Sequence, residues 1–239
     1  MNAPPNVRVE PFVDSVVEPQ VRGHIHQPEN SVGDGLILTH GAGSNSRAPL
    51  LIALAEEFSS AGFMVLRCDL PYRQVRSYGP PRPADAARDR EGLRNAVKAL
   101  RKLVPGRVFL GGHSYGGRQS SMLCAGEPDL VDGLLLLSYP LHPPRKPEQL
   151  RTQHLPNLRT PSLFVSGTRD PFGSVDEMEQ AMKLISARTK FLTVEGAGHD
   201  LNFTKGKIQS GSPVPFILSS FGEFFGGDTA KNCCGEARC

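Results

Sequence analysis

A serine between glycines stands out in the segment 112–116, which reads Gly-His-Ser-Tyr-Gly and is followed by a further glycine. An apolar run typical of a strand, 107–110, ends just before it, and a helical pattern begins at Tyr115. A Gly-x-Ser-x-Gly sequence between a strand and a helix is typical of a nucleophile elbow, a strained turn that exposes the serine hydroxyl. The start of the helix also favours negative charge that develops beside the serine. The pattern predicts that Ser114 is a nucleophile toward carbonyl carbon.

A serine hydroxyl is inert near neutral pH unless a base takes its proton and a carboxylate orients that base. Around a nucleophile elbow these partners follow the serine in the order Asp or Glu, then His. Asp170 comes soon after the apolar run 162–165, and His199 lies in a glycine-bearing segment after the apolar run 191–194. We therefore predict a catalytic triad of Ser114, Asp170 and His199.

Asp176 and Asp200 are the alternatives to Asp170 as the orienting carboxylate. Asp176 falls at the expected start of a helix. Asp200 is adjacent to His199, so its carboxylate would struggle to face the imidazole ring. The pattern favours Asp170.

Two backbone N–H groups are needed where the negative oxygen of a tetrahedral intermediate forms, in an oxyanion hole. One is expected from Tyr115, the residue after the nucleophile. The other is expected from Ala42 or Gly43, which follow an early apolar run in a loop whose glycines let N–H groups point into a site. His40 and His113 stand in these two loops and are interpreted as structural supports.

Little chain is left over to cover the predicted site. Only about twenty residues separate the strand that ends at Ser138 from the next strand, near Ser162, so there is no room for a helical cap domain. We expect an open, shallow pocket that favours small esters or a flexible acyl group presented from outside. Its edge is predicted to consist of Tyr72, Tyr139, Leu141 and His142.

Several basic side chains accompany these segments. Arg118 and Arg169 flank the predicted site in sequence, and two interpretations stay open: they form structural ion pairs, or they attract an anionic substrate. The arginines at 73, 76 and 82 are interpreted as a solvated loop face. His24 and His26 alternate onto one strand face, but with no further ligands in view a surface pair is favoured over a metal site.

The elements that must position these residues alternate along the chain. Apolar runs of strand length are expected at 7–10, 21–25, 35–40, 63–68, 107–110, 134–138, 162–165 and 191–194. Helical patterns are expected at 49–60, 83–103, 115–125, 175–187 and 215–225. Apolar strands separated by helices predict a single-domain α/β fold with a mostly parallel central sheet, helices on both faces and no cap. The domain is expected to cover 1–228, followed by a disordered tail, 229–239, that contains three cysteines.

Composition excludes several other classes of protein. With 38% hydrophobic and 21% charged residues, the chain resembles an ordinary soluble globular protein and not a disordered one. The net charge of +3 is dispersed, which argues against nucleic-acid binding. No apolar run reaches the roughly 18 residues of a membrane span, and the N-terminus does not resemble a signal peptide. An odd count of five cysteines favours the reducing cytoplasm.

Cofactors and metals are not expected. No Gly-rich phosphate loop with a lysine follows the first strand, which argues against a nucleotide-binding protein. The cysteines at 233, 234 and 239 could hold a metal, but a mobile tail with incidental thiols is favoured.

Four segments carry a resemblance to a known family. They are 39–43, 112–118, 138–144 and 167–173, which read THGAG, GHSYGGR, SYPLHPP and GTRDPFG. On these segments the chain resembles the α/β-hydrolase superfamily over about residues 7–226. In detail it is similar to the small, capless, dienelactone-hydrolase-like family that includes testis-expressed protein thirty and regulatory subunit three of the nonspecific-lethal acetyltransferase complex. The resemblance implies the same triad, at Ser114, Asp170 and His199, and leaves the substrate unspecified.

Two hypotheses about function follow. The first is a serine hydrolase that cleaves an ester, thioester or amide of a small-molecule acyl substrate through an acyl-enzyme. The second is a non-catalytic interaction subunit with an unknown protein partner, because one relative serves in a larger complex and fold does not dictate function. The complete triad favours the first.

Overall fold

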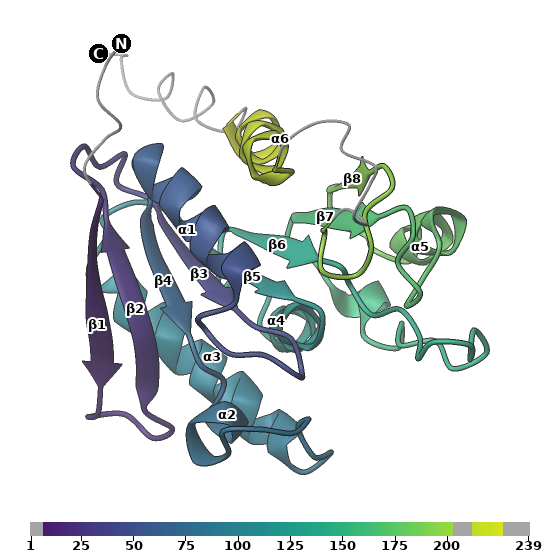
Figure 1. Cartoon of the computed structure of the whole chain (residues 1–239), viewed down its shortest axis with the longest axis horizontal. Coiled ribbons are helices and arrows are strands. Elements are labelled where there is room, and N and C mark those ends of the chain that lie inside the picture. The colour runs from purple at the N-terminus through teal and green to yellow at the C-terminus, as the bar shows by residue number, and fades with distance from the viewer. Residues whose placement is uncertain (1–6, 203–211, 227–239) are drawn as a thin grey trace, which may run out of the picture.

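The structure, a computed structural model, describes residues 7–202 and 212–226. Eight strands form one sheet in the order β1-β2-β4-β3-β5-β6-β7-β8 (Figure 1). Their bounds are β1 Arg8–Asp14, β2 Val21–Gln27, β3 Gly35–Thr39, β4 Met64–Cys68, β5 Val108–His113, β6 Gly133–Leu137, β7 Ser162–Gly167 and β8 Thr189–Val194. The helices are α1 Pro49–Ser60, α2 Pro71–Val75, α3 Asp85–Arg101, α4 Tyr115–Gly126, the 3-10 turn η1 Leu155–Asn157, α5 Val175–Met182 and α6 Val214–Gly226.

The sheet is parallel from β4 to β8, and only β1 and β2 run antiparallel to their neighbours. The central strands β3 and β6 are buried along their whole length. Such strands need helices on both faces, because neither face can meet water. The predicted fold class, an α/β fold with a mostly parallel sheet, is confirmed.

Alternation of side chains along the strands builds a separate core on each face of the sheet. Ile37 of β3 packs with side chains of α3 and α4, whereas Leu36 and Leu38 pack with side chains of α1 and α6. Figure 1 shows α1 and α6 on one side of the sheet and α3 and α4 on the other. The two cores hold the strands in place, so the loops at their carboxyl ends start from rigid supports.

The connection between β6 and β7, residues 138–161, contains one short helical element, η1. It confirms that no helical cap domain is inserted there. The expected helix over 175–187 ends earlier, at Met182, because the N–H groups of Leu184 and Ile185 bond carbonyls three residues back instead of four. The single turn α2 was not predicted. The predicted end of the domain at 228 and the cysteine-containing tail lie outside the described residues.

Candidate active site

The structure brings the three predicted triad residues together from three loops. The Nε2 atom of His199 lies 2.9 Å from the Ser114 hydroxyl oxygen. Its Nδ1 atom lies 2.8 Å from one carboxylate oxygen of Asp170 and 3.0 Å from the other. The loops follow β5, β7 and β8, three parallel strands whose carboxyl ends lie at one edge of the sheet. An unbroken hydrogen-bonded chain thus runs from carboxylate to imidazole to hydroxyl.

Ser114 occupies a strained turn. Its φ of 51° and ψ of −116° lie in a region that non-glycine residues rarely adopt. The neighbouring glycines are required by space: a Cβ atom on Gly112 would lie 2.6 Å from the backbone of Gly116, and one on Gly116 would lie 2.6 Å from the carbonyl oxygen of His40. This crowding explains why a serine with glycines two positions on each side turns sharply from strand into helix.

Of the three carboxylates considered, Asp170 is the one that faces His199. It is 8% exposed, and one of its oxygens also accepts a hydrogen bond from the Phe172 N–H at 2.9 Å. Asp176 lies in the first turn of α5. Asp200 is exposed and lies 3.9 Å from His113 rather than against the His199 ring.

Two aromatic side chains hold the His199 ring. The Phe172 ring packs on it with centroids 4.1 Å apart, and the His113 ring lies 5.1 Å away. His113 Nε2 also lies 2.9 Å from the His199 carbonyl oxygen. Burial lowers the pKa of His113, which keeps its imidazole neutral, so its Nε2–H donates to that carbonyl. Phe172 was missed by the sequence analysis, although it stands two residues after Asp170.

The loop that contains Ala42 and Gly43 is held from behind by α2. The Tyr72 hydroxyl donates to the carbonyl oxygens of Ala42 at 2.8 Å and Gly41 at 3.3 Å. The Arg73 guanidinium donates to the carbonyl oxygens of Ala42 at 3.1 Å and Ser44 at 2.7 Å. In a trans peptide the C=O and N–H groups point in opposite directions. The N–H groups of Ala42 and Gly43 are therefore turned away from α2, and both residues line a cavity beside Ser114.

The interpretation of Arg73 as part of a solvated loop face is wrong. Its side chain is buried, with 7% exposure for the residue, and besides the loop it bonds the carbonyls of Arg76 and Gly79. Its acceptors are backbone oxygens, which leave no signature in the sequence. His40 supports the same loop: its Nδ1 lies 2.9 Å from the Gly41 carbonyl oxygen, and its Nε2 accepts from the Leu70 N–H. Burial lowers the pKa of His40 to about 4, which keeps it neutral.

A cavity of about 510 Å³ opens above Ser114. One wall is the first turn of α1 and the residue before it, with the apolar side chains of Ala48, Pro49, Leu50 and Leu51. The lining also includes His199 and Phe172. The cavity therefore presents an apolar surface to one part of a ligand and the reactive groups to another.

The prediction of which residues form the pocket edge is wrong. Tyr72, Tyr139, Leu141 and His142 are all buried and none of them lines this cavity. Tyr72 lies behind the loop, Tyr139 donates its hydroxyl to the Arg151 carbonyl, and Leu141 lies against Gly173. The segment after β6 folds inward onto the core instead of rising beside Ser114, which is why the α1 side forms the wall.

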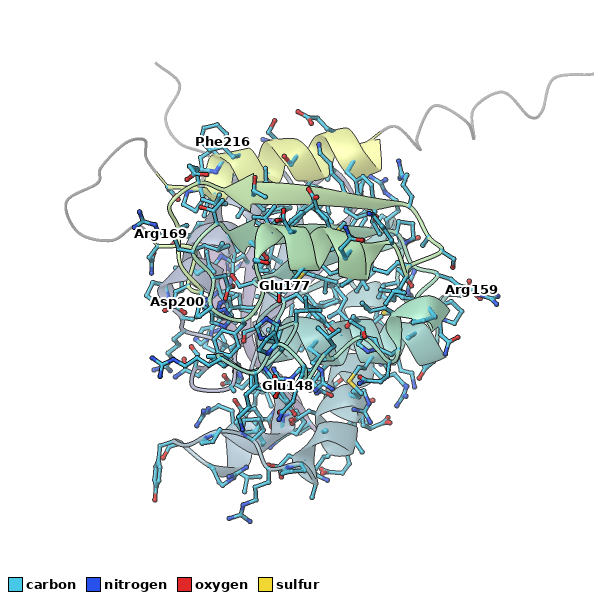
Figure 2. The ribbon with its side chains drawn as sticks, turned by 90° about the vertical axis from the view of Figure 1, so that its right-hand side faces the viewer. Glu148, Arg159, Arg169, Glu177, Asp200 and Phe216 are labelled. Atoms are coloured by element: carbon cyan, nitrogen blue, oxygen red, sulfur yellow. The ribbon has the colours of Figure 1, made fainter. Side chains whose placement is uncertain are left out.

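The remaining basic residues have distinct surroundings. His26 is buried, contrary to the predicted surface pair, and its Nε2 accepts a hydrogen bond from Arg67 Nε at 2.8 Å. Arg169 is exposed, and Figure 2 shows it at the same edge of the molecule as Asp200. Neither Arg118 nor Arg169 forms an ion pair with a carboxylate in the described parts of the chain, so the ion-pair interpretation of both is not supported.

Two further features concern ions and membranes. Within residues 7–202 and 212–226, no group of three or more His, Cys, Asp and Glu side chains could hold a metal ion. The helices in those same ranges include none with the length and apolar character needed to cross a bilayer.

Taken together, the parallel sheet and the strand-end loops define the class of α/β hydrolases. A family model described as an alpha/beta hydrolase domain matches residues 33–212, and the chain belongs to this family of enzymes.

Solved structures agree with this assignment at the level of the fold. Dienelactone hydrolase from Anabaena variabilis superposes with a TM-score of 0.71 at 20% identity, over 94% of this chain and 99% of that one. Est1E from Butyrivibrio proteoclasticus gives 0.68 at 17% identity, over 93% and 99%. An alpha-beta serine hydrolase homologue from Coxiella burnetii gives 0.65 at 18% identity, over 91% and 96%.

Proposed function

We propose that the chain is a serine hydrolase that cleaves an ester, thioester or amide of a small or exposed acyl group through an acyl-enzyme. The observation that carries this proposal is the hydrogen-bonded chain from Asp170 through His199 to Ser114 at a strained turn. A serine hydroxyl 2.9 Å from an imidazole nitrogen is within reach of proton transfer.

In the proposed reaction the Ser114 oxygen attacks the carbonyl carbon while His199 Nε2 accepts the hydroxyl proton. The bond to the leaving group then breaks, and His199 returns that proton to the departing oxygen, sulfur or nitrogen. A water molecule then attacks the acyl-enzyme while His199 takes one of its protons. The bond to Ser114 breaks, the carboxylic acid leaves, and His199 returns that proton to the Ser114 oxygen. Asp170 holds Nδ1–H throughout and stabilises the imidazolium that forms.

The oxyanion hole is assigned to the N–H groups of Tyr115, Ala42 and Gly43. The support comes from Tyr72 and Arg73, which hold the carbonyls of the loop on the far side. Donors fixed before the reaction need no reorganisation when negative charge appears on the substrate oxygen.

The substrate class follows from the α1 wall. Ala48, Pro49, Leu50 and Leu51 offer an apolar surface to an acyl or alcohol group, and a volume of about 510 Å³ admits a small or medium-sized one. The absence of a cap between β6 and β7 and the four motif segments support placing the chain with the small capless hydrolases related to testis-expressed protein thirty. The buried free thiols of Cys68 and Cys124 are consistent with action in the cytoplasm.

A fluorophosphonate probe tests the proposal, because it reacts with activated serine hydroxyls. The wild type should be labelled and Ser114→Ala should not. Ser60→Ala is the matched control, since Ser60 is an exposed serine at the end of α1, outside the cavity, and it should be labelled like the wild type. Equal labelling of wild type and Ser114→Ala, or background turnover of short and long acyl p-nitrophenyl esters, would contradict the proposal and favour the interaction subunit.

A further inference from the structure

The helices α3 and α4 cover the face of the sheet opposite α1 (Figure 1). Basic side chains of α3, α4 and the segment around η1 form a group on this side of the molecule. We call this group the arginine cluster. It consists of Arg90, Arg118, Gln119, Tyr139, Arg151 and His154.

Hydrogen bonds and a ring contact link members of the cluster and their neighbours. Arg90 of α3 donates to the amide oxygen of Gln119 on α4 at 2.9 Å. The hydroxyl oxygen of Ser121, also on α4, lies 2.8 Å from Nε2 of His154. The Tyr139 ring lies 6.4 Å from the His154 ring, and its hydroxyl donates to the carbonyl oxygen of Arg151 at 2.8 Å. Burial and then the positive charge of Arg118 lower the pKa of Arg151, and both Arg118 and Arg90 lie close enough to His154 to act on its charge. Three separate parts of the chain thus place basic side chains in one region.

The cluster lacks a counter-ion. None of Arg90, Arg118 and Arg151 forms an ion pair with a carboxylate in the described residues, whereas Arg94 on the same helix as Arg90 pairs with Glu127. Burial and then Arg118 and Arg90 lower the pKa of His154 to about 4. Half-buried cations of like sign raise the energy of the site unless an anion joins them.

Two donors in the cluster are buried and unused. Arg118 Nε and Gln119 Nε2 have no hydrogen-bond partner, and Gln119 is only 1% exposed. The amide orientation of Gln119 is determined by chemistry, because Arg90 can only donate and so must face the oxygen. With its oxygen bonded to Arg90, the Gln119 amide points its nitrogen in the other direction, where no acceptor of the described residues lies within hydrogen-bonding distance. Native proteins rarely leave such donors unpaired, so they point to a missing acceptor.

We propose that the arginine cluster binds a phosphate group, either free or carried by a phosphomonoester. Guanidinium forks and an amide N–H supply donors only, which matches the acceptor oxygens of phosphate. A phosphate dianion balances several cations, whereas a carboxylate brings a single charge. The site is separate from the cavity above Ser114, although Arg118 lies one helical turn after that serine and its N–H bonds the Ser114 carbonyl.

Calorimetric titration of the full chain with inorganic phosphate, at constant ionic strength, tests this proposal. Wild type should bind phosphate more tightly than acetate. Arg118→Gln and Arg90→Gln should each weaken phosphate binding by about tenfold or more, since each removes a charge-assisted donor. Arg169→Gln is the matched control, because Arg169 is exposed and outside the cluster, and it should bind phosphate like the wild type.

Further binding measurements distinguish this site from the proposed active site and free phosphate from a phosphomonoester. Ser114→Ala should bind phosphate like the wild type, so failure of the proposed hydrolase function and failure of this site are distinguishable. Tighter binding of phenyl phosphate than of inorganic phosphate identifies a phosphomonoester as the ligand, and equal binding identifies free phosphate. Thermal unfolding checks that the variants fold; if Arg118→Gln does not, Arg90→Gln decides. Phosphate binding that is equal in wild type and both cluster variants, or no tighter than acetate, would overturn the proposal.

Discussion

At the scale of single residues, the two nitrogens of His199 have different partners. Nδ1 faces the Asp170 carboxylate and Nε2 faces the Ser114 hydroxyl. The short segment from Asp170 to Phe172 makes two contacts with the His199 ring. The Asp170 carboxylate faces Nδ1, and the Phe172 phenyl ring packs against the imidazole. The position of the proton on His199 therefore depends on Asp170 more than on any other group in the site.

Replacing Asp170 by Asn should lower kcat for p-nitrophenyl esters by about three to four orders of magnitude. The amide cannot hold the Nδ1–H tautomer or stabilise the imidazolium. Steady-state kinetics measures the effect, with Asp176→Asn as the control that keeps wild-type activity. Loss of activity in Asp200→Asn but not in Asp170→Asn would show that the carboxylate is wrongly assigned.

At the scale of elements, the single turn α2 determines the shape of the loop above Ser114. Its residues Tyr72 and Arg73 donate hydrogen bonds to three backbone carbonyls of the loop, those of Gly41, Ala42 and Ser44. The Tyr72 ring packs in the core, so α2 is anchored there while its polar groups orient these peptides.

Replacing Arg73 by Lys should lower kcat by about tenfold and leave KM nearly unchanged. A lysine keeps the charge, but its single ammonium nitrogen cannot reach the carbonyls that the three nitrogens of the planar guanidinium contact, so the N–H groups of the loop lose their fixed direction while the cavity keeps its walls. The measurement is the separate determination of kcat and KM for a short acyl ester. Arg82→Lys, in the exposed segment that follows α2, is the control and should change neither value. A rise in KM alone would mean that Arg73 acts on substrate binding.

At the scale of the whole molecule, buried neutral histidines make the free energy of unfolding depend on pH. Burial lowers the pKa of both His26 and His40 from 6.5 to about 4. At pH values between about 4 and 6.5, these histidines bind more protons in the unfolded chain than in the folded one, so acid favours unfolding. The stabilisation is complete above the unfolded pKa and is lost as the pH falls toward 4.

The free energy of unfolding should decrease as the pH falls from about 6.5 to about 4, with each of these histidines contributing about 1.4 kcal/mol per pH unit. Urea denaturation at a series of pH values measures this slope. His40→Asn keeps a donor toward Gly41 but cannot titrate, so its slope should be smaller than that of the wild type. An identical slope in the variant would show that His40 does not titrate as its burial predicts.

The amino-acid sequence by itself determined the class of fold and the identity of the residues that face Ser114. Apolar runs of strand length alternate with helical patterns, and that periodicity depends only on local chain geometry. Asp170 and His199 could be predicted because each follows a strand, and the carboxyl ends of parallel strands converge at one edge whatever the details of packing.

Only the tertiary structure decided what surrounds those residues. The cavity wall comes from α1 rather than from Tyr139 and its neighbours, because the segment after β6 folds into the core. Arg73 bonds backbone carbonyls about thirty positions away, and Arg118 and Arg90 act together on the charge of His154 from two different helices. Contacts of this kind depend on how distant segments pack, and backbone oxygens are the same at every residue, so neither leaves a pattern along the sequence.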